Sequence, residues 1–131
     1  MTGSEYSKWI NALGVSEKLD AIRIALVRAA DRLGLDNEEV AGTLGVHRGM
    51  IRSMREGWPS LTDGQKAWEL AVLLVRLHNA LDSIMGEDKI AMQSWMQTEN
   101  KVLGGIPREL VQTVHGLVNA VDYLESRLQR V

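Results

Sequence analysis

The sequence contains no cysteine and only two prolines among its 131 residues. Without cysteine, disulfides and thiolate metal sites are excluded, and the chain is compatible with a reducing interior. The first residues show no basic region followed by a long apolar run, so no secretory signal peptide is expected and a cytoplasmic location is favoured. No segment predicts a cofactor or a metal ion.

No segment alternates apolar and polar residues with the period of two that a half-buried strand requires. Nearly every periodic segment has helical spacing instead. Internal repeats and low-complexity segments are absent. The chain is 45% hydrophobic and 24% charged, which suits a soluble protein with a sizeable core. The pattern predicts an all-α protein.

No group of residues has catalytic spacing. His78 and His115 lie far apart in the sequence and lack a nearby carboxylate arrangement or nucleophile, so each is expected to be structural. The pair Gly104-Gly105 lacks the preceding strand that a nucleotide-binding loop needs. Tryptophan and methionine residues are expected to fill the core. The sequence therefore does not predict an enzyme.

One central run, QKAWELAVLLVRLHNALDSIM at residues 65–85, has no glycine or proline. Its first half leaves almost no polar face, which is typical of a buried helix. Glu69, Arg76 and Asp82 make it too polar to span a membrane. We expect this long buried helix to join two domains, residues 1–64 and residues 65–131. Its surplus apolar surface is expected to meet a second protomer in a homodimer.

Further helices are predicted on both sides of this run. The spacing of Tyr6, Trp9, Ile10 and Leu13 favours a short docked helix within residues 1–14, with a frayed arm as the alternative. A helix over residues 16–33, capped by Ser16, should end at Gly34. Its expected inner stripe is Leu19, Ile22, Leu26, Ala29 and Leu33.

Three helices are predicted after residue 86. They cover residues 88–97, 107–112 and 114–130, with proline at the start of the second and Thr113 as the cap of the third. The first is expected to bury Ile90, Ala91, Met92 and Trp95. The last is expected to bury Val114, Leu117, Val118, Val121, Leu124 and Leu128.

Residues 37–55 have the spacing of a helix-turn-helix. Ala41 is small where two helices would cross, Gly45 permits a tight turn, and Ile51 can fill the angle between the helices. Asp36 and Glu39 form a capping-box pair just before it. The alternative is an ordinary helical corner within a bundle. Arginine-rich exposed positions favour DNA binding.

A DNA-binding helix over residues 46–56 would enter the major groove. The outward positions are His47, Arg48, Gly49, Arg52 and Ser53. Arg48 and Arg52 are expected to read bases, supported by Ser53, whereas Asn37 and Arg55 are placed for phosphates. His47 is expected to be a poor helix cap, and Gly49 costs about 1 kcal/mol of helix propensity relative to alanine.

Charge limits how strongly one copy could bind DNA. Residues 1–57 carry as many basic as acidic side chains, although arginines outnumber the single glutamate between Gly45 and Gly57. Non-specific attraction per monomer should therefore be weak, and useful affinity would need two copies.

The segment L-G-L-D-N-E-E-V-A-G-T-L-G-V-H-R-G-M-I-R-S resembles the Xre family of helix-turn-helix regulators. Further along, S-W-M-Q-T-E-N-K-V-L-G-G-I-P-R-E-L-V and T-V-H-G-L-V-N-A-V-D-Y-L resemble the Xre/MbcA/ParS toxin-binding domain. The order of the two modules matches as well. The resemblance implies an N-terminal helix-turn-helix bundle followed by a small helical toxin-binding domain.

The same resemblance implies an antitoxin that binds a RES-domain toxin, an NAD-depleting protein, and represses its own operon by binding operator DNA as a dimer. The residues implied or expected to contact the toxin are Trp95, Asn100, Leu103, Gly104, Pro107, Leu110, Tyr123, Arg127, Arg130 and Val131. The basic C-terminal end could reach an NAD-binding cleft, or its arginines could simply complement the helix dipole.

A second interpretation stays open. The chain could be a stand-alone Xre-type regulator whose C-terminal half only dimerises or senses a signal. An adjacent RES-type reading frame would favour the antitoxin.

Overall fold

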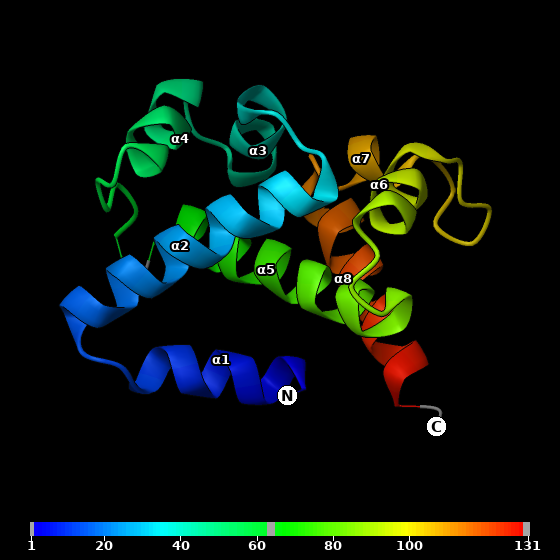
Figure 1. The fold of residues 1–131 in the computed structure, drawn as a ribbon, viewed down its shortest axis with the longest axis horizontal. Helices are drawn as coiled ribbons and strands as arrows, with labels where there is room; N and C mark the ends of the chain where they lie inside the picture. Colours follow the sequence, from blue (N-terminus) through cyan, green and yellow to red (C-terminus); the bar gives the residue numbers. More distant parts are fainter. Residues whose placement is uncertain (1, 63–64, 130–131) are drawn as a thin grey trace.

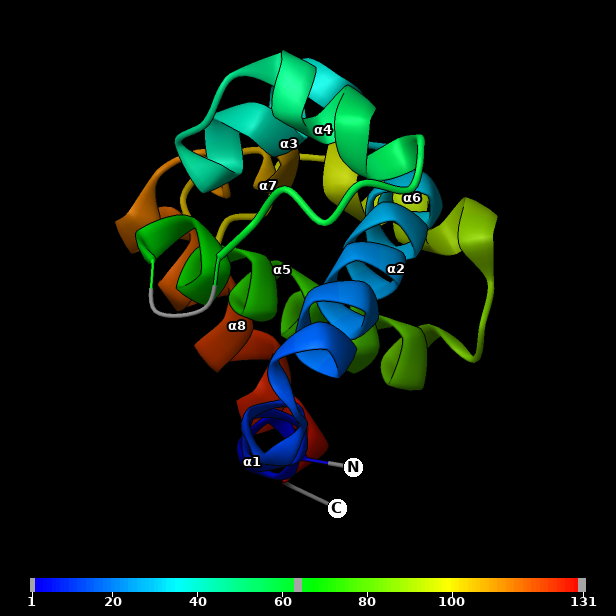
Figure 2. The ribbon, with the colours of Figure 1, turned by 90° about the vertical axis from the view of Figure 1, so that its left-hand side faces the viewer.

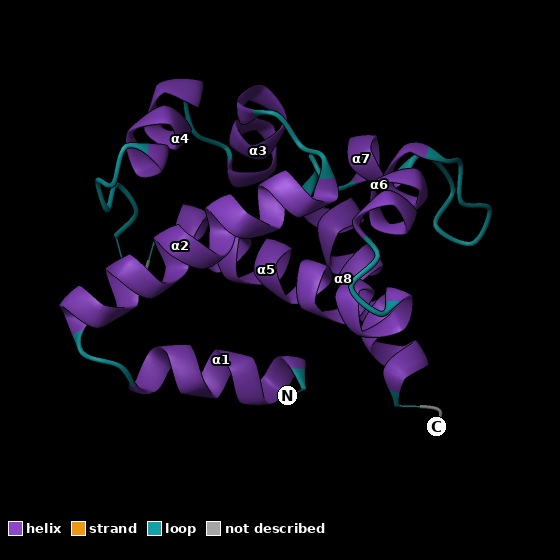
Figure 3. Ribbon diagram, viewed as in Figure 1, coloured by secondary structure: helices purple, strands orange, loops and turns teal. Residues whose placement is uncertain are grey.

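The computed structural model describes residues 2–62 and 65–129, without the side chains of Val15 and Ser16. Within these ranges the chain forms helices and no named strand, which confirms the all-α prediction (Figures 1 and 3). The helices are α1 Gly3–Ala12, α2 Val15–Leu33, α3 Asn37–Leu44, α4 Arg48–Arg55, α5 Lys66–Met85, α6 Lys89–Gln97, α7 Pro107–Leu110 and α8 Val114–Leu128.

Helix α5 runs through the centre of the molecule, as its apolar sequence predicts. Its most extensive contacts are with α8 and α2, and α3, α1 and α6 also pack against it (Figures 1 and 2). Trp68, Leu74 and Leu81 are buried along its length. Most of the apolar surface of α5 is therefore covered by other helices of the same chain. The proposed contact with a second protomer and the domain boundary at residue 64 stay predictions.

Helix α1 is docked rather than frayed. Ile10 is fully buried, and Thr2 and Glu5 form a capping box at the start of the helix. Trp9 is 47% exposed and Trp58 is 67% exposed, however, so the expectation that tryptophans fill the core is wrong at these two positions. Both lie at the periphery, one on the outermost helix and one in a loop.

Local sequence signals predicted several helix ends correctly. Gly34 and Gly45 have φ of 76° and 69°, the left-handed conformation that ends α2 and α3. Asp36 and Glu39 form the predicted capping box. Helix α2 begins one residue before the predicted Ser16 cap, because Gly14 occupies the N-cap position.

Two predicted inner stripes are partly wrong. In α6, Ile90 is 82% exposed, because the helix turns Met92 and Met96 to the core. Residue 90 lies about 200° around a helix from residue 92, on the opposite face. In α8, the expected core residues that are exposed instead are Val114, Val118 and Leu128. The buried stripe is narrower, comprising Leu117, Ala120, Val121 and Leu124.

Residues 98–106 form a compact loop between α6 and α7. Asn100 and Gly105 make an isolated antiparallel bridge, and the Asn100 side-chain oxygen accepts a hydrogen bond from the Leu103 N–H at 3.1 Å. Gly104 has φ of 85°, which favours glycine there. The segment after the loop is equally tight, since a Cβ on Gly116 would overlap the backbone carbonyl of Leu110.

Among the described residues, no helix combines the length and hydrophobicity that crossing a bilayer would require.

Candidate functional site

Helices α3 and α4 pack against each other across a three-residue turn, in agreement with the predicted helix-turn-helix. Both predicted core positions are buried: Ala41, where the two helices cross, and Ile51, in the angle between them. Met54 on α4 completes the shared core. This packing fixes the outward face of α4.

His47 is the N-cap of α4, contrary to the prediction that it caps poorly. Its Nδ1 accepts a hydrogen bond from the Gly49 N–H at 3.0 Å. An N-cap side chain satisfies a backbone donor that has no partner within the helix. The helix consequently begins at Arg48 rather than at residue 46. The imidazole nitrogen accepts the hydrogen bond that a serine or threonine hydroxyl commonly accepts at this position.

The arginines of α4 differ in how they are held. Arg48 pairs with Glu38 at 2.8 Å. Arg55 donates to the Asn37 side-chain oxygen at 2.7 Å. Arg52 is exposed and pairs with no carboxylate in the described part of the chain. It is therefore the arginine of α4 most available for an external partner.

The remaining candidates for DNA contact lie on the same module. Ser53 is half-buried on α4, and Gly49 lies in its first turn. Arg55 also pairs with Asp31 of α2 at 2.9 Å. Asn37 and Arg55, both expected at phosphates, are thus brought into direct contact with each other. The assignment of these residues to DNA stays a prediction.

A groove lies between the loop at residues 98–106 and the outer face of α8. Its volume is about 730 Å³. The residues that line it are Val102, Leu103, Asn119, Asp122, Tyr123, Ser126 and Arg127. Three predicted toxin-binding residues, Leu103, Tyr123 and Arg127, are therefore brought together.

Tyr123 and Arg127 form a unit at one end of this groove. The guanidinium of Arg127 lies 5.6 Å from the ring centre of Tyr123, and its Nη1 donates to the tyrosine hydroxyl at 3.1 Å. Such a contact holds an aromatic and a cationic group in one place. The predicted contacts Arg130 and Val131 lie outside the described residues.

The other predicted toxin contacts within the described residues do not line the groove. Pro107 is buried, and Trp95 and Leu110 are half-buried. Asn100 and Gly104 shape the loop, as described above.

Four groove residues were not predicted: Val102, Asn119, Asp122 and Ser126. Val102 is 77% exposed, an unusual position for a β-branched apolar side chain. The three others recur at i, i+3 and i+7 on α8, so their helical spacing could have identified one outward face.

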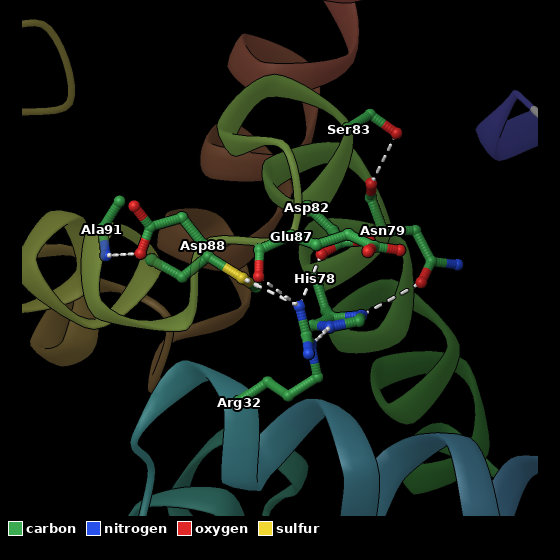
Figure 4. A network of polar contacts seen from close by, with 9 residues as sticks. Arg32, His78, Asn79, Asp82, Ser83, Glu87, Asp88 and Ala91 are labelled. Atoms are coloured by element: carbon green, nitrogen blue, oxygen red, sulfur yellow. Dashed lines mark hydrogen bonds and ion pairs between the residues drawn. The ribbon is translucent and has the colours of Figure 1, made fainter.

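A polar network joins α2 to α5 and α6 (Figure 4). Arg32 of α2 donates to His78 Nε2 at 3.0 Å and pairs with Asp82 at 2.6 Å. Its guanidinium also approaches the Met92 sulfur at 3.7 Å. His78 is only 6% exposed, and burial lowers the pKa of its imidazole despite the opposing influence of Asn79 and Asp82. The network thus links three helices around a buried histidine, with the side chains of Arg32 and Asp82 21% and 27% exposed.

Among residues 2–62 and 65–129, no group of three or more His, Asp or Glu side chains is arranged so that it could hold a metal ion.

The groove, the loop and α8 all fall within one recognised segment. Residues 80–128 match the family of the antitoxin Xre/MbcA/ParS C-terminal toxin-binding domain. The match supports an Xre-type antitoxin, that is, a protein whose partner is a toxin. The toxin-binding segment so defined begins in the second half of α5 and ends with α8. No curated protein matches the chain.

Proposed function

We propose that the chain is an antitoxin that neutralises a RES-type, NAD-depleting toxin and represses its own operon by binding operator DNA. The observation that carries the proposal is the groove between residues 98–106 and α8, which lies wholly inside the toxin-binding segment. The protein would act as a cytoplasmic homodimer without enzymatic activity.

The groove has features that suit a protein partner. Val102 presents apolar surface to solvent at its edge, and Tyr123 is half-buried on its α8 side. Aromatic and arginine side chains are enriched at the sites that contribute most to protein–protein binding. Tyr123 and Arg127 are already held against each other, so a partner would order few additional side chains.

The DNA-binding part of the proposal rests on α3 and α4. Arg52 is exposed on the outward face of α4, and Arg48 is held only by an exposed ion pair, with side chains 62% and 71% exposed. An exposed ion pair is worth about 0–1 kcal/mol, so DNA could displace it readily. Arginine can bind guanine through two hydrogen bonds in the major groove.

The RES identity of the toxin rests on the resemblance of both modules, in their order, to antitoxins of RES toxins. It is tested by co-expressing the tagged chain with the product of the adjacent reading frame. We expect the two to co-purify, and the isolated partner to consume NAD⁺ until the chain is added. If the partner forms a stable complex but consumes no NAD⁺, the chain would still be an antitoxin, and the RES identity of its toxin would be contradicted.

The stand-alone regulator remains the second candidate, because α3 and α4 pack as the predicted helix-turn-helix independently of the groove. It predicts binding to DNA upstream of the chain's own gene, no co-purifying partner and no protection of growth.

A further inference from the structure

Three arginines surround the start of α3, and each holds a carboxylate. The pairs are Arg48 with Glu38 at 2.8 Å, Arg55 with Asp31 at 2.9 Å, and Arg108 with Glu39 at 3.1 Å. The first two pairs lie within the N-terminal helices. The third arginine comes from α7, inside the toxin-binding segment, and thus connects the two modules.

Glu39 is fixed by two contacts at once. Its Oε1 accepts a hydrogen bond from the Asp36 N–H at 3.1 Å, and its Oε2 forms an ion pair with Arg108, whose Nε lies 3.1 Å away. Its side chain is only 20% exposed. These contacts hold the carboxylate at the first turn of α3, where Asn37 is expected to meet a phosphate.

Gly42 of α3 lies close to Gln112, in the turn that follows α7. A Cβ on Gly42 would lie 2.6 Å from the side-chain oxygen of Gln112, so a larger residue would displace the end of that exposed side chain. Gln112 in turn donates to the backbone carbonyl of Arg108 at 3.2 Å. Figures 1 and 2 show α7 on the same upper side of the molecule as α3, and in Figure 1 α3 lies between α7 and α4. Arg108 is 39% exposed there.

We propose that Arg108 is part of the DNA-binding surface, as the counter-charge that allows a phosphate to approach the start of α3 beside Glu39. This inference rests on the proposed DNA binding. An uncompensated carboxylate within one Debye length, about 10 Å at 0.1 M salt, would repel the phosphate. Arg108 removes that repulsion.

A consequence concerns both partners. Arg108 lies in α7, inside the segment that matches the toxin-binding family. A toxin that engages this side chain would change the charge that DNA meets at α3. The two partners would then share one residue.

The test measures equilibrium binding to a duplex from upstream of the chain's own gene, at about 0.1 M salt. Arg108→Gln should weaken binding about tenfold, in the range expected for losing one favourable charge near the phosphates. Arg108→Lys keeps the charge and should bind within about threefold of wild type. Lys66→Gln, which removes an equally positive side chain that is 89% exposed on α5, is the matched control and should have no effect.

The second arm uses Glu39. Glu39→Gln retains an oxygen that can accept from the Asp36 N–H, so the capping box survives while the charge is lost. The double variant Glu39→Gln/Arg108→Gln is neutral at this point, like wild type, and should recover binding to within about threefold. Thermal melting checks that each variant is folded.

Two outcomes would overturn the proposal and leave DNA binding intact. In the first, Arg108→Gln has the same DNA affinity as Lys66→Gln, while the affinity of Arg52→Ala is reduced. In the second, the double variant binds DNA as weakly as Arg108→Gln. If the wild-type chain does not bind the duplex, the proposed DNA binding fails, and the role of Arg108 fails with it.

Discussion

Arg32 Nε donates a hydrogen bond to His78 Nε2 across 3.0 Å, and this contact ties α2 to α5. Because Nε2 accepts, the imidazole must be neutral with its proton on Nδ1, directed toward the Asn79 side-chain oxygen at 3.0 Å. Protonation of Nε2 would set two cationic groups against each other and remove the bond. This hydrogen bond between α2 and α5 therefore requires an uncharged histidine.

Stability should fall on mild acidification. Burial lowers the pKa of His78 below its ordinary 6.5, so below pH 6.5 the unfolded chain binds a proton that the folded chain does not. The stabilisation is complete above pH 6.5 and is lost as the pH falls toward the lowered pKa. The slope is at most about 1.4 kcal/mol per pH unit for one group. Urea unfolding between pH 5 and 7.5 measures it.

Two histidine variants test whether His78 causes this dependence of stability on pH. His78→Gln should flatten the dependence between pH 5 and 6.5, whereas His115→Gln, at an exposed position on α8, should leave it unchanged. An unchanged slope in His78→Gln would show that the histidine does not cause it.

Gly116→Ala should destabilise the fold by roughly 1–3 kcal/mol or more, as overpacking does. The added Cβ would overlap the backbone carbonyl of Leu110 and lie 2.9 Å from Thr113 Oγ1, and backbone cannot move aside cheaply. Denaturant unfolding gives the loss. Asn119→Ala, an exposed substitution on the same helix, should stay within about 0.5 kcal/mol of wild type. Equal stability of the two variants would show that α7 and α8 can separate freely.

Arg52→Ala should reduce binding to DNA from upstream of the chain's own gene by about tenfold or more, because a base contact by arginine contributes about 1–3 kcal/mol. The side chain is exposed and has no ion-pair partner among the described residues, so the folded structure should not suffer. Arg28→Ala removes an exposed arginine from α2 and should bind normally. Gel-shift titration compares them, and equal affinities would remove Arg52 from the DNA surface.

Helix ends were predictable because their signals are local. Gly34, Gly45 and Gly86 each take the left-handed conformation that ends a helix, and the Asp36–Glu39 capping box is encoded within four residues. His47 was misjudged because an imidazole cap depends on its rotamer and protonation. Helix faces were less predictable. Val114 and Val118 fit a helical stripe, but only the packing of α8 on α5 determines how wide that stripe is.

The groove could be predicted only in part. Leu103 and Tyr123 were expected at the toxin from the resemblance, and Arg127 from the basic end of the last helix, yet their meeting depends on how the loop folds back beside α8. The ion pair of Arg108 with Glu39 joins residues far apart in the sequence, and no local sequence pattern predicts such a contact.

Growth protection by groove variants tests the central claim most directly. Cells expressing the product of the adjacent reading frame would receive the wild-type chain, Val102→Asp or Ile24→Asp. Val102 is 77% exposed in the groove, and Ile24 is 56% exposed on α2, outside the toxin-binding segment. A buried, unpaired carboxylate at the interface should abolish protection by Val102→Asp, while Ile24→Asp protects fully. Full protection by Val102→Asp would contradict the groove as the toxin-binding surface.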